Sequence, residues 1–273
     1  MALGKKLSFI GSGRMAEAII GGIIKKKLYL PGRIYISDKD AERTKGLARK
    51  FRVISCEDNN RAVWAGNVII LAVKPQNMSQ VLPQIKEDIK ASQLVISIAA
   101  GVPLSFLEKE LKGCPVIRTM PNNPCLIGEG MSAIAAGKNA GNSDIKTATD
   151  IFDCLGKTVV ISEKHFDAVT GLSGSGPAFV YEFVAALAEG GIKAGLDRQT
   201  AYLLAVQTAI GSVKALKETG KSHKELVEMV ASPGGTTVEG LKVFEEAGFS
   251  QIVADAVYAA ASRSRSISRE LAG

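Results

Sequence analysis

The stretch KLSFIGSGRMA, residues 6–16, decides the fold. Residues 6–10 read as a short strand, and the chain then turns through a glycine loop into a helical pattern. Gly11 permits a tight turn, Gly13 lets a pyrophosphate approach the backbone, and the small Ala16 keeps the helix close to the sheet. Because strand, glycine loop and helix follow one another directly, the stretch predicts a dinucleotide-binding βαβ unit.

The end of the next predicted strand, residues 33–37, bears on which nucleotide is bound. Asp38 favours a free ribose 2′-hydroxyl and therefore NAD. Ser37, Lys39 and Arg43 favour a 2′-phosphate and therefore NADP. The residues leave both open, so NADPH and NADH are both candidate cofactors.

Three further segments follow predicted strands, where open α/β sheets bind ligands: AVKPQ at 72–76, AAGV at 99–102 and RTMPNNP at 118–124. Asn59 lies in a predicted loop and is either a surface asparagine or a neighbour of the adenosine. These segments hold few acids or bases, which favours hydride transfer, chemistry that the cofactor carries, over hydrolysis or phosphoryl transfer. The residues predicted to bind the cofactor are Ile10, Gly11, Ser12, Gly13, Arg14, Met15, Ser37, Asp38, Lys39, Asn59, Ala72, Val73, Lys74, Pro75, Ala99, Ala100 and Gly101.

The composition, 46% hydrophobic and 22% charged over 273 residues, is typical of a soluble globular protein. Residues 1–162 carry 23 basic and 14 acidic side chains, and residues 163–273 carry 11 and 13, so the net charge of +7 comes from the first part. That excess suits an anionic ligand, but no interleaving of aromatic and basic residues favours nucleic acid. With neither a signal peptide nor an apolar run long enough for a bilayer, we expect a cytoplasmic protein without a membrane partner.

The four cysteines, Cys56, Cys114, Cys125 and Cys154, are widely scattered and form no CxxC pair, and the chain has only two histidines. We therefore expect no metal site, and we expect the cysteines to be buried free thiols.

The hydrophobic pattern divides the chain into two domains. In residues 1–162 short β-branched runs alternate with helical segments, which predicts an α/β, Rossmann-type dinucleotide-binding domain with a parallel sheet. Residues 163–273 carry only helical patterns, and their recurrent alanine and glycine residues predict close helix contacts, made either within the chain or with a partner subunit. The predicted strands are residues 6–10, 33–37, 68–73, 94–98, 116–119, 132–135 and 158–161, with a short one near 52–54; the predicted helices of the second domain are 177–194, 198–219, 224–231 and a pair after residue 237.

The segment SPGGTT, residues 232–237, stands between two of these helices. Glycine permits positive φ, so the N–H groups of Gly234, Gly235 and Thr236 can converge at a helix start and bind a carboxylate. Nearby hydroxyls, including that of Thr237, would cap the helix or donate to a ligand. The segment is either a plain turn or an anion site.

Taken together, these motifs resemble one family, pyrroline-5-carboxylate reductase. The resemblance covers essentially the whole chain, through FIGSGRMA, AVKPQ, SIAAGV, RTMPNNP, LSGSGPAFVYEF and, most specifically, ELVEMVASPGGTTVEGLKVFE. One departure is GKSHKEL at 220–226, where family members often carry His-Pro after the glycine, and it leaves the conformation of that loop open.

The resemblance implies reduction of L-1-pyrroline-5-carboxylate to L-proline, the last step of proline biosynthesis, with NADPH favoured over NADH. It implies substrate contacts at Gly234, Gly235, Thr236, Thr237, Ser173 and Glu163. It also implies a helical dimerisation domain and a homodimer, with larger rings up to a decamer of five dimers. Within this scheme we expect Thr237 to be the catalytic residue, hydrogen-bonded to the ring nitrogen of the substrate.

Two alternatives stay open at this stage. A β-hydroxyacid dehydrogenase also pairs a Rossmann domain with a helical one, but it would want a catalytic lysine on the long interdomain helix, and Lys193 lies only near the end of that helix. A non-catalytic NAD(P)-sensing oligomer would use residues 232–237 merely as a turn. The sequence leaves the preferred cofactor, the oligomer size, feedback by proline and the proton donor undecided.

Overall fold

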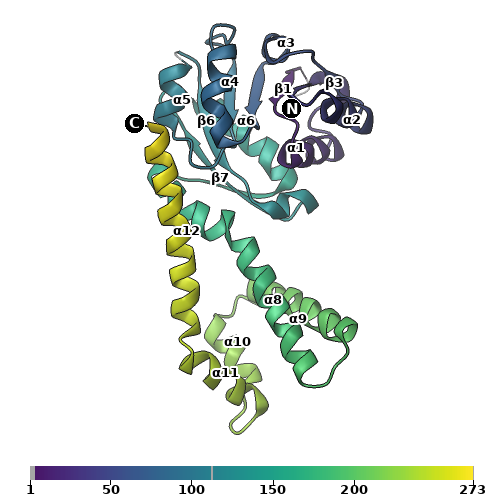
Figure 1. The fold of residues 1–273 in the computed structure, drawn as a ribbon, viewed down its shortest axis with the longest axis vertical. Coiled ribbons are helices and arrows are strands. Elements are labelled where there is room, and N and C mark those ends of the chain that lie inside the picture. Colours follow the sequence, from purple (N-terminus) through teal and green to yellow (C-terminus); the bar gives the residue numbers. More distant parts are fainter. Residues whose placement is uncertain (1–3, 112, 273) are drawn as a thin grey trace. The chain divides into compact units, whose positions relative to one another are not determined.

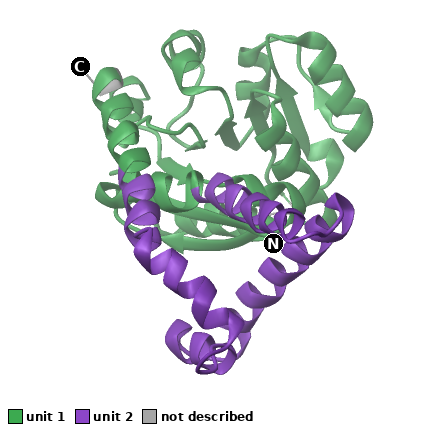
Figure 2. Ribbon diagram, turned by 60° about the horizontal axis from the view of Figure 1, so that its bottom comes forward, with its two compact units in different colours: residues 1–175, 259–273 green, residues 176–258 purple. Residues whose placement is uncertain are grey.

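The structure is a computed structural model that describes residues 4–111 and 113–272. The chain forms two compact units, which Figure 2 distinguishes: the sheet unit, residues 1–175 with 259–273, and the helical unit, residues 176–258. The change from strand to helix patterns suggested a boundary after residue 162, whereas packing joins residues 163–175 and the last turns of the chain to the sheet unit. Phe166 explains part of this difference, because its side chain is buried in the core of the sheet unit.

The sheet unit is built on an eight-stranded sheet with the order β3-β2-β1-β4-β5-β6-β7-β8. All the predicted strands are present, including the short one that precedes residue 56. The expectation of a fully parallel sheet was wrong at one place, because β7 runs antiparallel to β6. Only residues 121–129 connect these two strands, too little chain for the crossover that a parallel pair requires. The strands are β1 (Leu7–Ile10), β2 (Ile34–Ser37), β3 (Ile54–Ser55), β4 (Val68–Leu71), β5 (Leu94–Ser97), β6 (Val116–Met120), β7 (Gly130–Ala136) and β8 (Gly156–Val160).

Helices cover both faces of this sheet (Figure 1). On β4, Val68 and Ile70 pack into one core with α1, α2 and α6, while Ile69 and Leu71 pack into the other with α3, α4 and α5. This alternation explains why the strand is apolar at every position. The helices are α1 (Arg14–Lys25), α2 (Ala41–Phe51), α3 (Asn59–Ala65), α4 (Met78–Ile85), α5 (Leu104–Glu110), α6 (Asn142–Phe152) and α7 (Phe166–Val169), with the short helical turns η1 (Pro31–Arg33), η2 (Pro75–Asn77), η3 (Asn123–Ile127), η4 (Asp153–Leu155), η5 (Glu163–His165) and the π-helical η6 (Thr170–Gly174).

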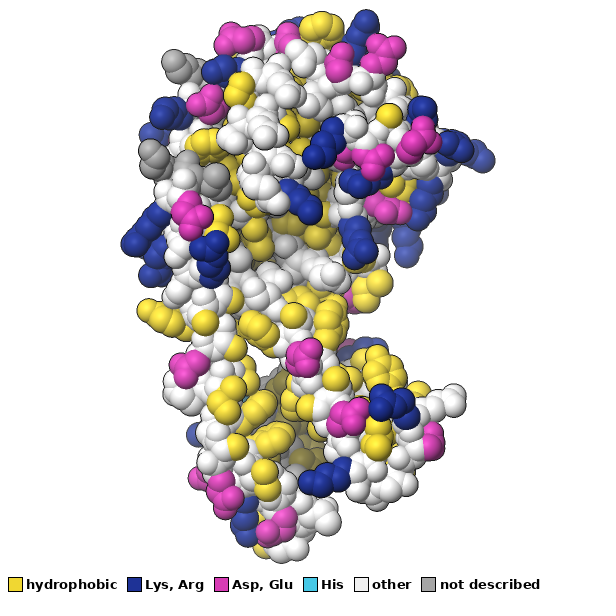
Figure 3. Space-filling view, viewed as in Figure 1, with side chains coloured by type: hydrophobic (Ala, Val, Ile, Leu, Met, Phe, Trp, Pro, Cys, Tyr) yellow, Lys and Arg dark blue, Asp and Glu magenta, His cyan; other side chains and the backbone are white. Residues whose placement is uncertain are grey.

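The helical unit contains the helices that the sequence predicts after residue 176. Its buried core is small: Ala188 of one helix packs with Ala201 and Ala205 of the next. Many large apolar side chains of this unit are exposed instead, and Figure 3 shows them gathered over its helices. No helix in the described part of the chain is long and apolar enough to cross a membrane. The helices are α8 (Gly176–Lys193), α9 (Arg198–Glu218), α10 (His223–Val230), α11 (Thr236–Glu246) and α12 (Phe249–Ala272), the last of which continues into the sheet unit.

Candidate cofactor and substrate site

The glycine loop joins the carboxyl ends of three strands in the sheet unit. Gly11 has φ +103°, and a Cβ there would lie 2.6 Å from the Ala72 carbonyl oxygen, so only glycine fits. The Gly11 N–H donates to the Ser37 carbonyl at 2.7 Å, and the Ala72 N–H donates to the Ile10 carbonyl at 2.8 Å. A Cβ on Gly13, by contrast, would meet no atom within 4 Å, which leaves open space at the N-terminus of α1. An anionic ligand can therefore approach this helix end.

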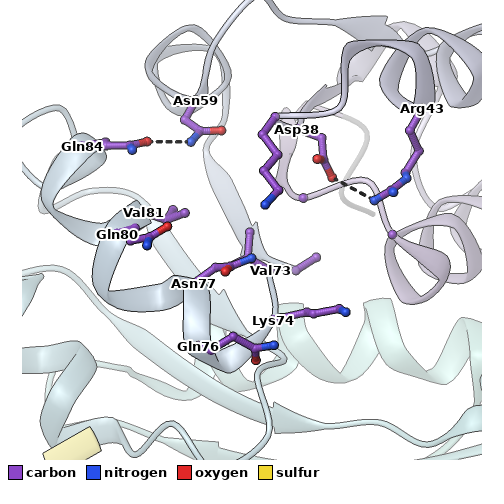
Figure 4. Close-up of a pocket in the computed structure, with 14 residues that line it drawn as sticks. Asp38, Arg43, Asn59, Val73, Lys74, Gln76, Asn77, Gln80, Val81 and Gln84 are labelled. Atoms are coloured by element: carbon purple, nitrogen blue, oxygen red, sulfur yellow. Dashed lines mark hydrogen bonds and ion pairs between the residues drawn. The ribbon is translucent and has the colours of Figure 1, made fainter.

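Two hollows of about 490 and 750 Å³ share part of their walls around this loop, and together we call them the cofactor cleft. Figure 4 shows the smaller one. The cleft lies where the strand order reverses between β1 and β4, the position at which open α/β sheets bind ligands. Of the residues predicted to bind the cofactor, those lining it are Gly11, Ser12, Gly13, Arg14, Met15, Asp38, Lys39, Asn59, Ala72, Val73, Lys74, Pro75, Ala99 and Ala100.

Three predicted residues do not line the cleft but support it from behind. The Ile10 side chain is buried in the core. Ser37 is 1% exposed, and its hydroxyl donates to Asn59 Oδ1 at 2.9 Å. A Cβ on Gly101, which has φ +74°, would lie 2.7 Å from Ile267 Cγ2, so the last turns of α12 back this loop.

The expected loop position of Asn59 was wrong, because Asn59 is the first residue of α3. Helix formation there is favoured by Asp58, whose carboxylate accepts the Arg61 N–H at 2.7 Å. The Asn59 amide donates to Gln84 Oε1 at 3.1 Å (Figure 4). Asn59 is thus fixed at the wall of the cleft by groups on both of its sides.

Sequence reasoning missed the side of the cleft formed by Asn77 and α4, and it named Gln76, Met120 and Pro121 only within the segments 72–76 and 118–124 expected at the ligand site, not among the cofactor residues. The signal was present in KPQNMSQ, because a helix that starts directly after a strand in such a sheet presents its first turns to the ligand site. The additional lining residues include Gln76, Asn77, Gln80, Val81, Gln84, Met120 and Pro121.

Asp38 is held by hydrogen bonds on both carboxylate oxygens. Oδ2 accepts the N–H of Ser12 at 2.7 Å and its hydroxyl at 3.1 Å, and Oδ1 accepts the Asp40 N–H at 3.0 Å. Burial acts to raise the pKa of Asp38, but these hydrogen bonds and the Arg43 guanidinium outweigh it and hold the pKa below its ordinary value. The carboxylate is therefore charged at neutral pH.

Glu163 and Ser173, two of the predicted substrate residues, both belong to the sheet unit. Glu163 Oε1 accepts the Leu104 N–H at 2.7 Å and the Arg118 guanidinium at 2.8 Å. Ser173 lies in the π-helical turn η6, and its hydroxyl is buried without a hydrogen-bond partner in the described structure. Short π-helical turns are frequent at functional sites.

The segment 232–237 lies in the helical unit and forms the N-terminus of α11. Gly234 has φ +73°, and the Gly235 N–H donates to the Ser232 carbonyl at 2.9 Å. No side chain caps α11, and the N–H groups of Thr236 and Thr237 have no acceptor among the described residues. This helix end therefore offers unpaired donors together with the positive end of the helix dipole to an anion.

Comparison with known proteins identifies the family. A family model described as pyrroline-5-carboxylate reductase dimerisation matches residues 163–267, and one described as NADP oxidoreductase, coenzyme F420-dependent, matches residues 6–101. The chain is 43% identical to the pyrroline-5-carboxylate reductase of Methanosarcina acetivorans, over 97% of this chain and 99% of that protein. The chain belongs to the pyrroline-5-carboxylate reductase family. It is thus an enzyme of the oxidoreductase class.

Solved structures of pyrroline-5-carboxylate reductases have the same fold. The enzyme from Coxiella burnetii is 32% identical, with a TM-score of 0.90 over 97% of this chain and 98% of that one. The Plasmodium falciparum enzyme, solved with NADP bound, is 33% identical, with a TM-score of 0.87 over 97% of this chain and 98% of that one. The fold class expected from the sequence, a Rossmann-type domain followed by helices, is confirmed.

The unusual segment GKSHKEL forms a regular helix start in this pyrroline-5-carboxylate reductase. Ser222 is the N-cap of α10, its hydroxyl accepts the Glu225 N–H at 3.3 Å, and the Glu225 carboxylate accepts the Ser222 N–H at 2.7 Å. Gly220, with φ +68°, supplies the preceding turn. This reciprocal capping box shows how the helix begins where family members often carry His-Pro.

Proposed function

We propose that this enzyme reduces L-1-pyrroline-5-carboxylate to L-proline with NADPH or NADH, the last step of proline biosynthesis. Full-length similarity to pyrroline-5-carboxylate reductases carries the proposal. The unpaired N–H groups at the start of α11 support it, because the substrate is a carboxylate.

The cofactor cleft has the features that a dinucleotide requires. The backbone at Gly11 and Gly13 and the N-terminus of α1 would hold the pyrophosphate, and residues 38–43 with Asn59 would hold the adenosine half. Residues 72–75 with Ala99 and Ala100 would position the nicotinamide half. When bound, the reduced nicotinamide supplies a hydride to the imine carbon of the substrate.

The first turn of α11 would bind and orient the substrate. The N–H groups of Thr236 and Thr237 would hold its carboxylate, with Gly234 and Gly235 shaping the turn, because the expected donor Gly235 N–H is bonded to the Ser232 carbonyl. The Thr237 hydroxyl would hydrogen-bond the ring nitrogen, where the product carries an added proton. Thr237 suits this role because its side chain is half-buried, whereas that of Thr236 is exposed. Ser173 offers a buried hydroxyl without a partner in the described structure, and Glu163 a carboxylate that is already fixed in place.

We further propose a cytoplasmic homodimer formed through the helical unit, with assembly of five such dimers into a decamer. The helical unit buries few large side chains of its own, and apolar residues such as Leu203, Met229 and Tyr258 are exposed. The match to a dimerisation family over residues 163–267 supports a second copy as the group that covers them.

The two alternative functions have no comparable support. Lys193, the lysine that a β-hydroxyacid dehydrogenase would need, is the exposed last residue of α8. A non-catalytic sensor leaves the unpaired N–H groups of α11 without a role.

One assay tests the proposal. The purified protein is mixed with NADPH and pyrroline-5-carboxylate, the absorbance at 340 nm is followed, and the product is analysed for proline. We expect cofactor oxidation that depends on the substrate and forms an equal amount of proline. Cofactor binding without turnover would contradict the proposal and favour the sensor.

A further inference from the structure

Asp38 occupies the position at the end of β2 where a carboxylate commonly binds the ribose of NAD. In this protein its carboxylate is engaged with the glycine loop instead. Three hydrogen bonds, two from Ser12 and one from the Asp40 N–H, use three of the roughly four acceptor sites that a carboxylate offers. The side chain is only 11% exposed. Little of it is left for a ribose hydroxyl.

Ser12 extends this connection into α2. Its side chain is buried, and its hydroxyl lies 3.5 Å from that of Thr44, whose own hydroxyl donates to the Asp40 carbonyl at 3.0 Å. The glycine loop is therefore tied through Ser12 to the end of β2 and to the first turn of α2. Loss of the Asp38 carboxylate would release the Ser12 N–H, which sits between the two glycines of the loop.

The cations beside Asp38 are arranged differently. The Arg43 guanidinium lies 3.9 Å from the Asp38 carboxylate and 3.1 Å from the Asp40 carboxylate, and these two groups balance part of the Arg43 charge. Lys39 is exposed, lines the same hollow, and its ammonium group has no hydrogen bond or ion pair within residues 4–111 and 113–272. The free positive charge at this end of the cleft is thus that of Lys39, and a 2′-phosphate is the part of a dinucleotide that would use it.

We propose that Asp38 is a positioning residue that holds the glycine loop in its binding conformation, that it does not discriminate between the two nucleotides, and that Lys39 selects NADPH over NADH. The proposal rests on the proposed function only in that the cleft binds a dinucleotide. It resolves the conflict between Asp38 and Lys39 that the sequence alone leaves open.

Calorimetric titration of the full-length protein with NADPH and with NADH tests both parts. We expect Asp38→Asn to weaken binding of the two nucleotides by the same factor, about tenfold, because the loop that holds their shared pyrophosphate is loosened. We expect Lys39→Ala to weaken NADPH about tenfold and NADH less than twofold. Glu42→Gln, a matched charge change on an exposed side chain of the following helix α2, should alter neither affinity. Tighter NADPH binding by Asp38→Asn together with weaker NADH binding would overturn the positioning role, because that is the behaviour of a ribose-binding carboxylate.

Hydrogen exchange in the protein without nucleotide gives a second readout that does not depend on activity. Peptides that cover residues 11–16 should exchange faster in Asp38→Asn than in the unchanged protein or in Glu42→Gln, while peptides from β4 and β5 should not change. Equal exchange in all three proteins would refute the positioning role. If the unchanged protein bound neither nucleotide, the proposed function would fail, and the exchange result would still decide whether Asp38 holds the loop.

Discussion

The guanidinium of Arg118 lies 2.8 Å from the carboxylate of Glu163, and the same carboxylate oxygen accepts the N–H of Leu104. The contact joins the turn η5 to the start of α5 and to β6, which lie 59 and 45 residues earlier in the sequence. Arg118 is 5% exposed and also stacks on Phe166, with 4.7 Å between the guanidinium carbon and the ring centroid. Glu163 therefore fixes the segment that leads from the sheet toward the helical unit.

Glu163→Gln should destabilise the sheet unit by about 2 kcal/mol, because it leaves the Arg118 charge buried without its partner. We expect less than the roughly 3–5 kcal/mol of a fully buried pair, because the Glu163 side chain is 30% exposed. Denaturation in urea measures the change. Lys146→Met, which breaks an exposed pair with Asp150 on α6, is the control and should cost less than about 0.5 kcal/mol. Equal effects of the two substitutions would mean that the Arg118 pair does not fix this segment.

Gly101→Ala should weaken NADPH binding, because its Cβ would press on Ile267 and shift the neighbouring Ala99 and Ala100, which line the cleft. The positive φ adds roughly 1 kcal/mol of strain. In the double variant Gly101→Ala/Ile267→Ala part of the NADPH affinity should return, because the Ile267 side chain that the new Cβ would contact has been shortened. Titration with NADPH measures both variants. Ile145→Ala, which shortens a half-buried isoleucine on α6, is the control for lost packing and should leave the NADPH affinity unchanged. If the double variant bound NADPH more weakly than Gly101→Ala, the contact between residues 101 and 267 would not be the cause of the loss.

Individual residues show which features of the fold and the site the sequence predicts and which it does not. Gly11 and Ala16 predict the glycine loop because backbone sterics permit few alternatives there, and the strands follow from their apolar pattern. The contact between Gly101 and Ile267 could not be predicted, since the two residues are 166 positions apart and no local sequence pattern indicates that the two segments meet. The sequence also did not show that Asp38 accepts a hydrogen bond from Ser12, because the type of a residue does not reveal which donors lie near its carboxylate in the fold.

The contribution of Asp38 to stability should depend on pH in acid. Its pKa is lowered in the folded protein from the ordinary value of 3.8, so the unfolded chain binds a proton more readily. The stabilisation is therefore complete above pH 3.8 and is lost as the pH falls through the lower, folded value. The melting temperature of Asp38→Asn should lie below that of the unchanged protein at pH 6, and the gap should narrow from pH 4 to pH 2.5. A gap that is constant over this range would show that the Asp38 charge does not stabilise the fold.

Two thiols should resist alkylation in the folded protein. Burial raises the pKa of Cys114 and of Cys154 to about 11. At pH 8 only about one molecule in a thousand then carries the reactive thiolate at each position. Mass spectrometry after treatment with iodoacetamide should find both unmodified in buffer and both modified in urea. Rapid labelling of Cys114 in buffer would mean that this part of the fold opens readily.

Thr237→Ala should lower kcat about 100-fold, the size of effect found when one donor to the reacting group is removed. The affinity for NADPH should not change, because Thr237 lies outside the sheet unit that holds the cofactor cleft. Thr236→Ala is the matched control: the residue is adjacent, on the same turn of α11, but its side chain is exposed, so we expect less than a twofold effect. Thr237→Ser keeps the hydroxyl and should retain most of the rate. Steady-state kinetics of the three variants separate the role of the hydroxyl from that of the backbone N–H groups, which all three retain. Full activity in Thr237→Ala would show that the Thr237 hydroxyl has no role in the reaction and that this turn contributes only through its backbone N–H groups.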